Sequence, residues 1–155
     1  TVSREGDLSY PQRAVRDARF LYIQNLKPDR WPAGSPTMKS SHGWEYGDID
    51  MSPSFTYIND NKNIPSIENF FVFATGKRPA EELFDIINDP ACQNNLAYDK
   101  SFEGDKIRLS MVLKDYLLET NDPRVTFNKS TWEDYPYYFK NPNGIKPYHN
   151  LRNEK

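Results

Sequence analysis

The sequence contains one cysteine, Cys92, so no disulfide can form within the chain, and a small domain stapled by disulfides is excluded. It also lacks any apolar run close to the roughly 18 residues that cross a membrane as a helix. Because the net charge is only -2, we expect neither a nucleic-acid partner nor a membrane partner. The chain starts at Thr1 without an initiator methionine or a signal peptide, and we therefore expect a piece of a longer polypeptide.

Motifs that would build a self-sufficient active site are also missing. Two histidines are present, His42 and His149, and neither has a second histidine or cysteine at zinc-finger spacing. No nucleophile elbow, Walker loop or dinucleotide-binding glycine motif occurs. Asp48 and Asp50 could face one cation, but the glycine and closing glutamate of an EF-hand loop are absent. We predict no catalytic residue and no metal site in this chain.

What is present predicts an α+β fold, a small antiparallel sheet with a long helix packed across it and long irregular aromatic loops. A hairpin is expected over 11–26, connected at Asp17-Ala18, and a third strand over 82–86. Pro65 and Gly76 bound a helix over 65–75, and Ser101 is expected to cap a longer helix over 101–120. These elements form one domain over 1–123.

Two long segments show no regular pattern. Residues 27–64 are interrupted by Pro, Gly, Ser, Asn and Asp, so we expect an irregular loop, and its aromatic residues argue against disorder. Residues 124–155 are expected to form an extended tail that packs on the domain.

The helix expected over 101–120 has apolar residues on two faces. The stripe expected to lie on the sheet consists of Ile107, Met111, Leu113, Leu117 and Leu118. The second stripe consists of Leu109, Val112 and Tyr116. We expect the aromatic tail to cover the second stripe, and the alternative is a partner domain.

Three stretches, in order and spanning roughly residues 10 to 120, match one known pattern. They are YPQRAVR at 10–16 with FLYIQNLKPDRWPAG at 20–34, YGDIDMSP at 46–53, and KRPAEELFD at 77–85 with NDP at 88–90 and NNLA at 94–97. This pattern resembles the C-terminal region of the sulfatase superfamily, especially enzymes similar to heparan N-sulfatase. The resemblance implies a C-terminal subdomain with a small antiparallel sheet and a long helix, docked beside an active-site cleft.

Sulfatases hydrolyse sulfate esters or sulfamates. Their nucleophile is a formylglycine made within a Cys/Ser-x-Pro/Ala-x-Arg motif, and a bound Ca²⁺ polarises the sulfate. The family carries both in its N-terminal domain, and Cys92, followed by Gln-Asn-Asn-Leu, does not fit the motif. The resemblance therefore implies a pocket-shaping and structural domain, inactive by itself. Its partners would be the N-terminal catalytic domain of the same polypeptide and a sulfated sugar, in the periplasm or outside the cell.

Four residues of the long loop are candidates for substrate contact: Arg30, Trp31, His42 and Trp44. Arginine recognises sulfate through its planar fork of donors, and sugar rings stack on aromatic side chains. The tryptophans could instead pack the loop onto its own domain, and Arg30 could pair with Asp29. A carbohydrate-binding module without catalytic activity, with Trp31 and Trp44 as stacking platforms, is the alternative function.

Overall fold

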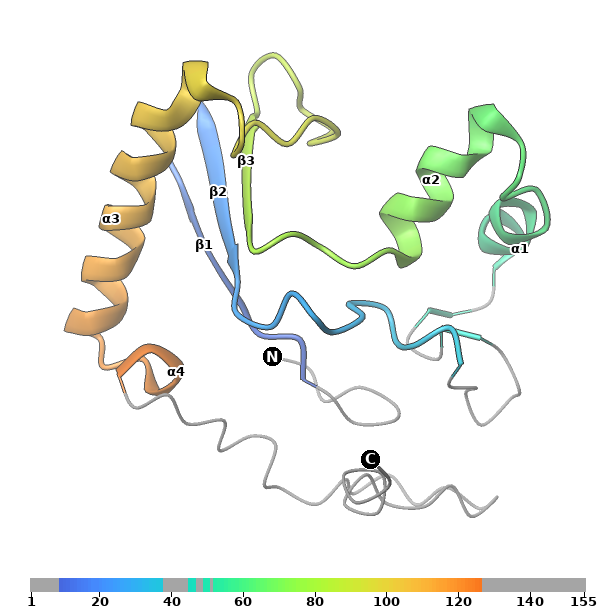
Figure 1. The fold of residues 1–155 in the computed structure, drawn as a ribbon, viewed down its shortest axis with the longest axis horizontal. Helices are drawn as coiled ribbons and strands as arrows, with labels where there is room; N and C mark the ends of the chain where they lie inside the picture. Colours follow the sequence, from blue (N-terminus) through green and yellow to red (C-terminus); the bar gives the residue numbers. More distant parts are fainter. Residues whose placement is uncertain (1–8, 38–44, 47–48, 51, 127–155) are drawn as a thin grey trace. The chain divides into compact units, whose positions relative to one another are not determined.

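A computed structural model describes residues 9–37, 45–46, 49–50 and 52–126 of the chain (Figure 1). These residues divide into two compact units. One unit contains the described residues 9–10 and those between 29 and 78. The other contains residues 11–28 and 79–126. Each unit is described below by itself.

The second unit is built on a three-stranded antiparallel sheet of order β1-β2-β3. The strands are β1 (Gln12–Arg16), β2 (Phe20–Asn25) and β3 (Glu81–Asp85). Tyr22 in the central strand pairs with Val15 of β1 and Leu83 of β3. The α+β class and the hairpin are confirmed, and β3 starts one residue earlier than predicted.

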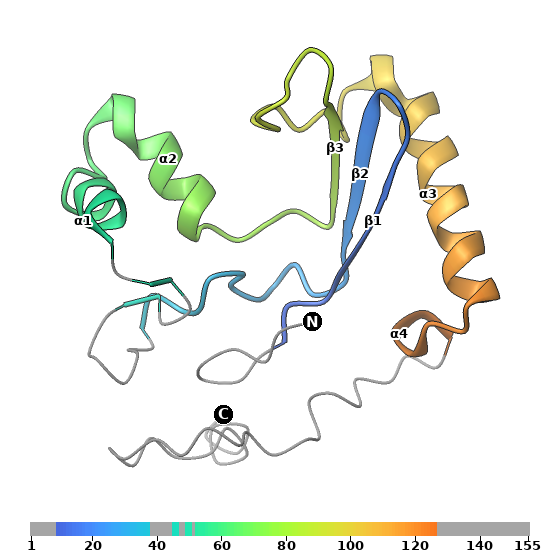
Figure 2. The ribbon, with the colours of Figure 1, turned by 180° about the vertical axis from the view of Figure 1, so that it is seen from behind.

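A long helix, α3 (Glu103–Glu119), lies along one face of this sheet (Figure 2). It follows a 3-10 turn, η1 (Lys100–Phe102), whose cap is Asp99. The carboxylate of Asp99 accepts a hydrogen bond from the backbone N–H of Ser101 at 2.8 Å. The prediction that Ser101 caps the long helix is therefore wrong, since the N-cap of α3 is Phe102, without a side-chain bond.

The prediction of which helix face lies on the sheet is confirmed for Leu113 and Leu117, which are buried in the core. It is wrong for the other three residues of that stripe, and Leu109, assigned to the second stripe, is buried instead. The buried helix residues form a row at four-residue spacing, and they are Leu109, Leu113 and Leu117. They join Phe20, Tyr22, Leu83 and Ala97 in one core. Ile107, Met111 and Leu118, assigned to the sheet side, are 49%, 58% and 46% exposed. A row of i, i+4 and i+8 leucines spans the sheet on a narrow face, so the flanking apolar residues stay outside.

The outer edge of β3 is held by the side chain of Asn95. Its amide oxygen accepts from the backbone N–H of Leu83 at 2.9 Å, and its amide nitrogen donates to the carbonyl of Glu81 at 3.1 Å. The N–H of Leu96 then donates to the carbonyl of Leu83 at 2.8 Å. One side chain and one peptide group thus take the place of a fourth strand.

The first unit contains two helices, α1 (Pro53–Asp60) and α2 (Pro65–Thr75). The bounds predicted for α2 are confirmed. The prediction of an unbroken loop over 27–64 is wrong, because α1 lies within it. Ser52 caps α1 by accepting from the N–H of Phe55 at 3.1 Å, and Pro53 fits the first helical position.

The segment predicted as an extended tail starts differently from that prediction. A short helix, α4 (Pro123–Thr126), occupies its first residues, and Val125 packs against the core of the second unit. Residues 127–155, including the aromatic residues expected to cover α3, lie outside the described part of the chain.

Candidate functional site

The first unit contains a cluster of three aromatic rings drawn from separate segments. Trp31 meets Tyr46 edge to face with centroids 6.5 Å apart, and Tyr46 meets Phe71 of α2 in the same way at 5.9 Å. Tyr46 is buried and has a positive φ of 55°, a conformation uncommon for a residue with a side chain. Trp31 is half-buried, so part of its surface remains open to a ligand.

Two lysines lie against this cluster. The Nζ atom of Lys77 is 5.1 Å from the ring centroid of Trp31, and that of Lys62 is 5.2 Å from the centroid of Phe71. Ammonium groups at such distances are attracted by the negative face of an aromatic ring. The cluster therefore combines flat apolar surface with two positive charges, which is a combination suited to an anionic sugar.

The four predicted contact residues are only partly described. Trp31 belongs to the aromatic cluster, which fits both stacking and packing of the loop. The guanidinium of Arg30 donates to the carbonyl of Ser9 at 2.9 Å, a contact that fixes the loop. His42 and Trp44 lie outside the described residues. The structure thus joins Trp31 to Tyr46 and the lysines, and the predicted grouping of all four residues stays a prediction.

The described residues lack the features of a metal site and of a reactive thiol. No group of three or more His, Cys, Asp or Glu side chains gathers there in a way that could hold a metal ion. Burial raises the pKa of the Cys92 thiol above its usual value, and the nearby carboxylate of Asp89 acts in the same direction. A protonated thiol is a weak nucleophile.

None of the described helices is long and apolar enough to cross a membrane.

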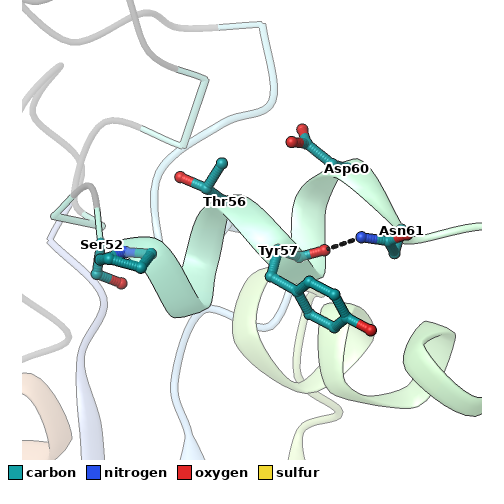
Figure 3. A pocket seen from close by; sticks show the side chains of 6 residues that line it. Ser52, Thr56, Tyr57, Asp60 and Asn61 are labelled. Carbon is teal, nitrogen blue, oxygen red and sulfur yellow. Dashed lines mark hydrogen bonds between the residues drawn. The ribbon is translucent and has the colours of Figure 1, made fainter.

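A shallow hollow lies beside α1 (Figure 3). Its lining consists of Ser52, Pro53, Thr56, Tyr57, Asp60 and Asn61. All of these belong to one helix and its two caps, and Asn61 Nδ2 is already bonded to the carbonyl of Tyr57 at 2.8 Å. A specific ligand site needs polar groups that converge from several elements, so this hollow is a weak candidate.

Sequence reasoning missed Lys62, Phe71 and Lys77 as members of the site. Lys77 is 46 positions from Trp31 in the chain, and no local pattern links the two. Lys77 lies instead in the third of the stretches that carry the family resemblance. Its neighbour Arg78 does act structurally, because it donates to the carbonyl of Phe73 at 2.7 Å, near the end of α2.

No protein-family model matches the chain, and no curated protein matches it.

Proposed function

We propose that this chain is the C-terminal substrate-pocket and structural domain of a sulfatase that acts on sulfated saccharides, in the periplasm or outside the cell. The reaction would be hydrolysis of a sulfate ester or a sulfamate. In this proposal the chain is inactive by itself. The formylglycine and Ca²⁺ are supplied by an N-terminal catalytic domain of the same polypeptide, and this chain completes the pocket.

The observation that carries the proposal is a buried polar pair between two of the resembling stretches. The side-chain amide of Asn25, in the first stretch, donates to a carboxylate oxygen of Glu82, in the third, at 2.9 Å. These residues are 57 positions apart and are 3% and 6% exposed. Buried polar groups need such partners, so the two stretches require each other. A family pattern that contains both stretches explains why Asn25 and Glu82 occur together.

The remaining part of the third stretch belongs to the same hydrogen-bonded unit. Asn25 Nδ2 also donates to the carbonyl of Pro79 at 2.7 Å, and Asn95 holds the outer edge of β3. Asn25, Glu82 and Asn95 of the resembling stretches thus join strands and corners of the second unit. A sequence pattern that specifies a folded subdomain contains such joining residues. Their presence in the resembling stretches supports the proposed family.

The second candidate function is a carbohydrate-binding module, and the Trp31 cluster favours it. An aromatic platform with adjacent lysines can bind a saccharide without any catalytic partner. Both functions predict a saccharide ligand, and they differ only in whether sulfate is released.

Sulfate release therefore decides between them. The reading frame that encodes the chain is first examined upstream of Thr1 for a Cys/Ser-x-Pro/Ala-x-Arg motif. The encoded protein, produced with its formylglycine-generating partner, is then incubated with N-sulfated and O-sulfated oligosaccharides, and free sulfate is measured by ion chromatography. We expect release with Ca²⁺ present, and none from a variant whose motif Cys or Ser is replaced by Ala. A frame without the motif, or a protein that releases no sulfate, would overturn the sulfatase proposal.

A further inference from the structure

We propose that Lys77 and Lys62 are the anion-binding residues of a saccharide site centred on Trp31, and that the chain itself binds anionic polysaccharides. The inference rests on the proposed function for the choice of a saccharide. It extends that function because this binding needs no catalytic domain, and because the anion contacts come from the two ends of α2 instead of from Arg30.

The first step is that both ammonium groups lie beside the same cluster of aromatic rings. Lys62 precedes α2 and Lys77 follows it, and each Nζ is held near an aromatic ring of one cluster. A cation held in this way loses less freedom when a ligand binds than a lysine that extends into water. The two ends of one helix thereby present two charges beside one ring cluster.

The second step is that neither ammonium is paired with a carboxylate of the described residues. Within the part of the chain that the structure describes, no carboxylate lies within ion-pair distance of either ammonium. The second unit behaves differently, since Lys106 faces Glu81 at 3.9 Å and Arg108 faces Asp17 at 2.6 Å. An anion that reaches Lys62 or Lys77 therefore displaces no carboxylate of these described segments.

The third step is that the ring of Trp31 can contact the sugar that carries the anion. Lys77 lies over the ring of Trp31, with its ammonium 5.1 Å from the ring centroid, so an anionic group bound to Lys77 brings the remainder of the sugar beside the indole. The C–H face of a pyranose then packs on the part of the ring that the ammonium does not cover. The buried ring of Tyr46 contacts Trp31 edge to face. A neutral sugar would gain the stacking alone, and a free anion the charge alone.

The ligand class follows from these three steps. Sulfate and carboxylate groups both accept hydrogen bonds from an ammonium. The site therefore fits a polysaccharide whose pyranose rings carry either group, and a test must distinguish the two sources of the charge.

Calorimetric titration of the 155-residue chain with three hexasaccharides makes this test. One is sulfated (from heparin), one carries only carboxylates (from unsulfated heparosan), and one is neutral (cellohexaose). We expect the sulfated ligand to bind, and the neutral ligand to bind at least about tenfold more weakly, the value of one charged hydrogen bond. Binding of the heparosan ligand as well would show that carboxylate suffices, and its absence would show that sulfate is needed. Both results uphold the site.

Matched variants locate the binding. Lys77→Met and Lys62→Met remove the charge and keep most of the length of the side chain. Both positions lie outside the core, so we expect the variants to fold, and circular dichroism checks this. Lys114→Met removes the same charge from the exposed face of α3 and serves as the control. We expect K77M to weaken binding of the sulfated ligand about tenfold, the double variant to weaken it further, and K114M to leave it unchanged.

Three results would overturn the inference: no binding of either anionic ligand, equal binding of the neutral one, or equal losses from K77M and K114M. Its failure differs from a failure of the proposed function. A protein that releases sulfate but whose chain does not bind disproves only this site. A chain that binds, encoded in a frame without a nucleophile, disproves only the sulfatase.

Discussion

Arg13 of β1 holds the carboxylate of Asp122, which lies 109 positions later between α3 and α4. The Nε atom of Arg13 donates to Asp122 Oδ2 at 2.8 Å, and an Nη atom donates to the same oxygen. The other carboxylate oxygen accepts from the N–H of Arg124 at 3.0 Å. A single side chain thus connects the first strand to the first turn of α4.

Replacing this contact should destabilise the second unit. Arg13 and Asp122 are mostly buried, at 21% and 13% side-chain exposure, so the pair is screened less than a surface ion pair. We expect Asp122→Ala to lower the free energy of unfolding by about 1–3 kcal/mol, measured by urea denaturation. Arg16→Ala, at an exposed position of the same strand, should cost less than about 0.5 kcal/mol. Equal costs would show that the charged contact adds nothing.

The packing of α3 predicts a sharp contrast between neighbouring residues. Leu113 is 4% exposed and Met111 is 58% exposed. We expect Leu113→Ala to cost about 2–5 kcal/mol, because it leaves a cavity between helix and sheet. Met111→Ala should cost less than about 1 kcal/mol. Thermal unfolding monitored at 222 nm measures both, and a large cost at Met111 would mean that the outer face of α3 is covered.

The sequence predicted the secondary-structure elements better than their faces. Runs of β-forming residues joined by a tight connection located the hairpin of the second unit, and Pro65 with Gly76 located α2 of the first unit. The sheet-facing side of α3 was predicted only in part, because apolar residues surround much of this helix and periodicity alone did not separate the stripes. Helix α1 was missed although Ser52-Pro53 carries a cap signal, because its eight residues are too few for a repeating apolar pattern.

Of the candidate site, the sequence predicted the ring of Trp31 as a ligand contact. Trp31 stands in a loop rich in aromatic residues, which is a local signal. Tyr46 belongs to the same loop, but Phe71 lies in α2 and Lys77 just after it, and only the tertiary fold brings these two residues to Trp31. Arg30 was predicted as an anion contact from its residue type; its guanidinium donates to a backbone carbonyl, and the anion contact stays a prediction.

The cap of α1 provides a test that is local to the first unit. Ser52→Ala removes the acceptor of the Phe55 N–H and should destabilise the helix by about 1 kcal/mol. Hydrogen exchange of the amides over Pro53–Asp60 should then quicken about fivefold, the rate factor that corresponds to this energy. Ser54→Ala, inside the same helix, should leave exchange unchanged or slow it, because alanine is the better helix former. Unchanged exchange in S52A would contradict the assigned cap.

Two carboxylates should make the fold sensitive to acid. Hydrogen bonds from the N–H of Phe20 and from Arg108 lower the pKa of Asp17 to about 2. The guanidinium of Arg19, with Asn88, lowers the pKa of Asp85 as well. A carboxylate whose pKa is lower in the folded state stabilises that state above its unfolded pKa of about 3.9, and this contribution is lost as the pH falls through the folded value.

We therefore expect the urea midpoint to fall between about pH 4 and pH 2. Asp17→Asn should be less stable than the parent at pH 7, and the difference should shrink toward pH 2. Asp115→Asn, at an exposed position of α3, is the control and should follow the parent at every pH. A difference for D17N that stays constant with pH would show that Asp17 contributes no charge-dependent stability.

The Asn95 clamp also bears on how copies of this chain can meet. A free strand edge is a template for intermolecular pairing and for fibre growth. At β3 the donor of Leu83 and the acceptors of Glu81 and Leu83 are already occupied, so an incoming strand finds no free groups at those positions. Strand addition is thereby directed to β1, where the exposed Arg16 presents a positive charge that an identical strand would also carry. The chain thus protects one sheet edge by hydrogen bonding and the other by charge repulsion.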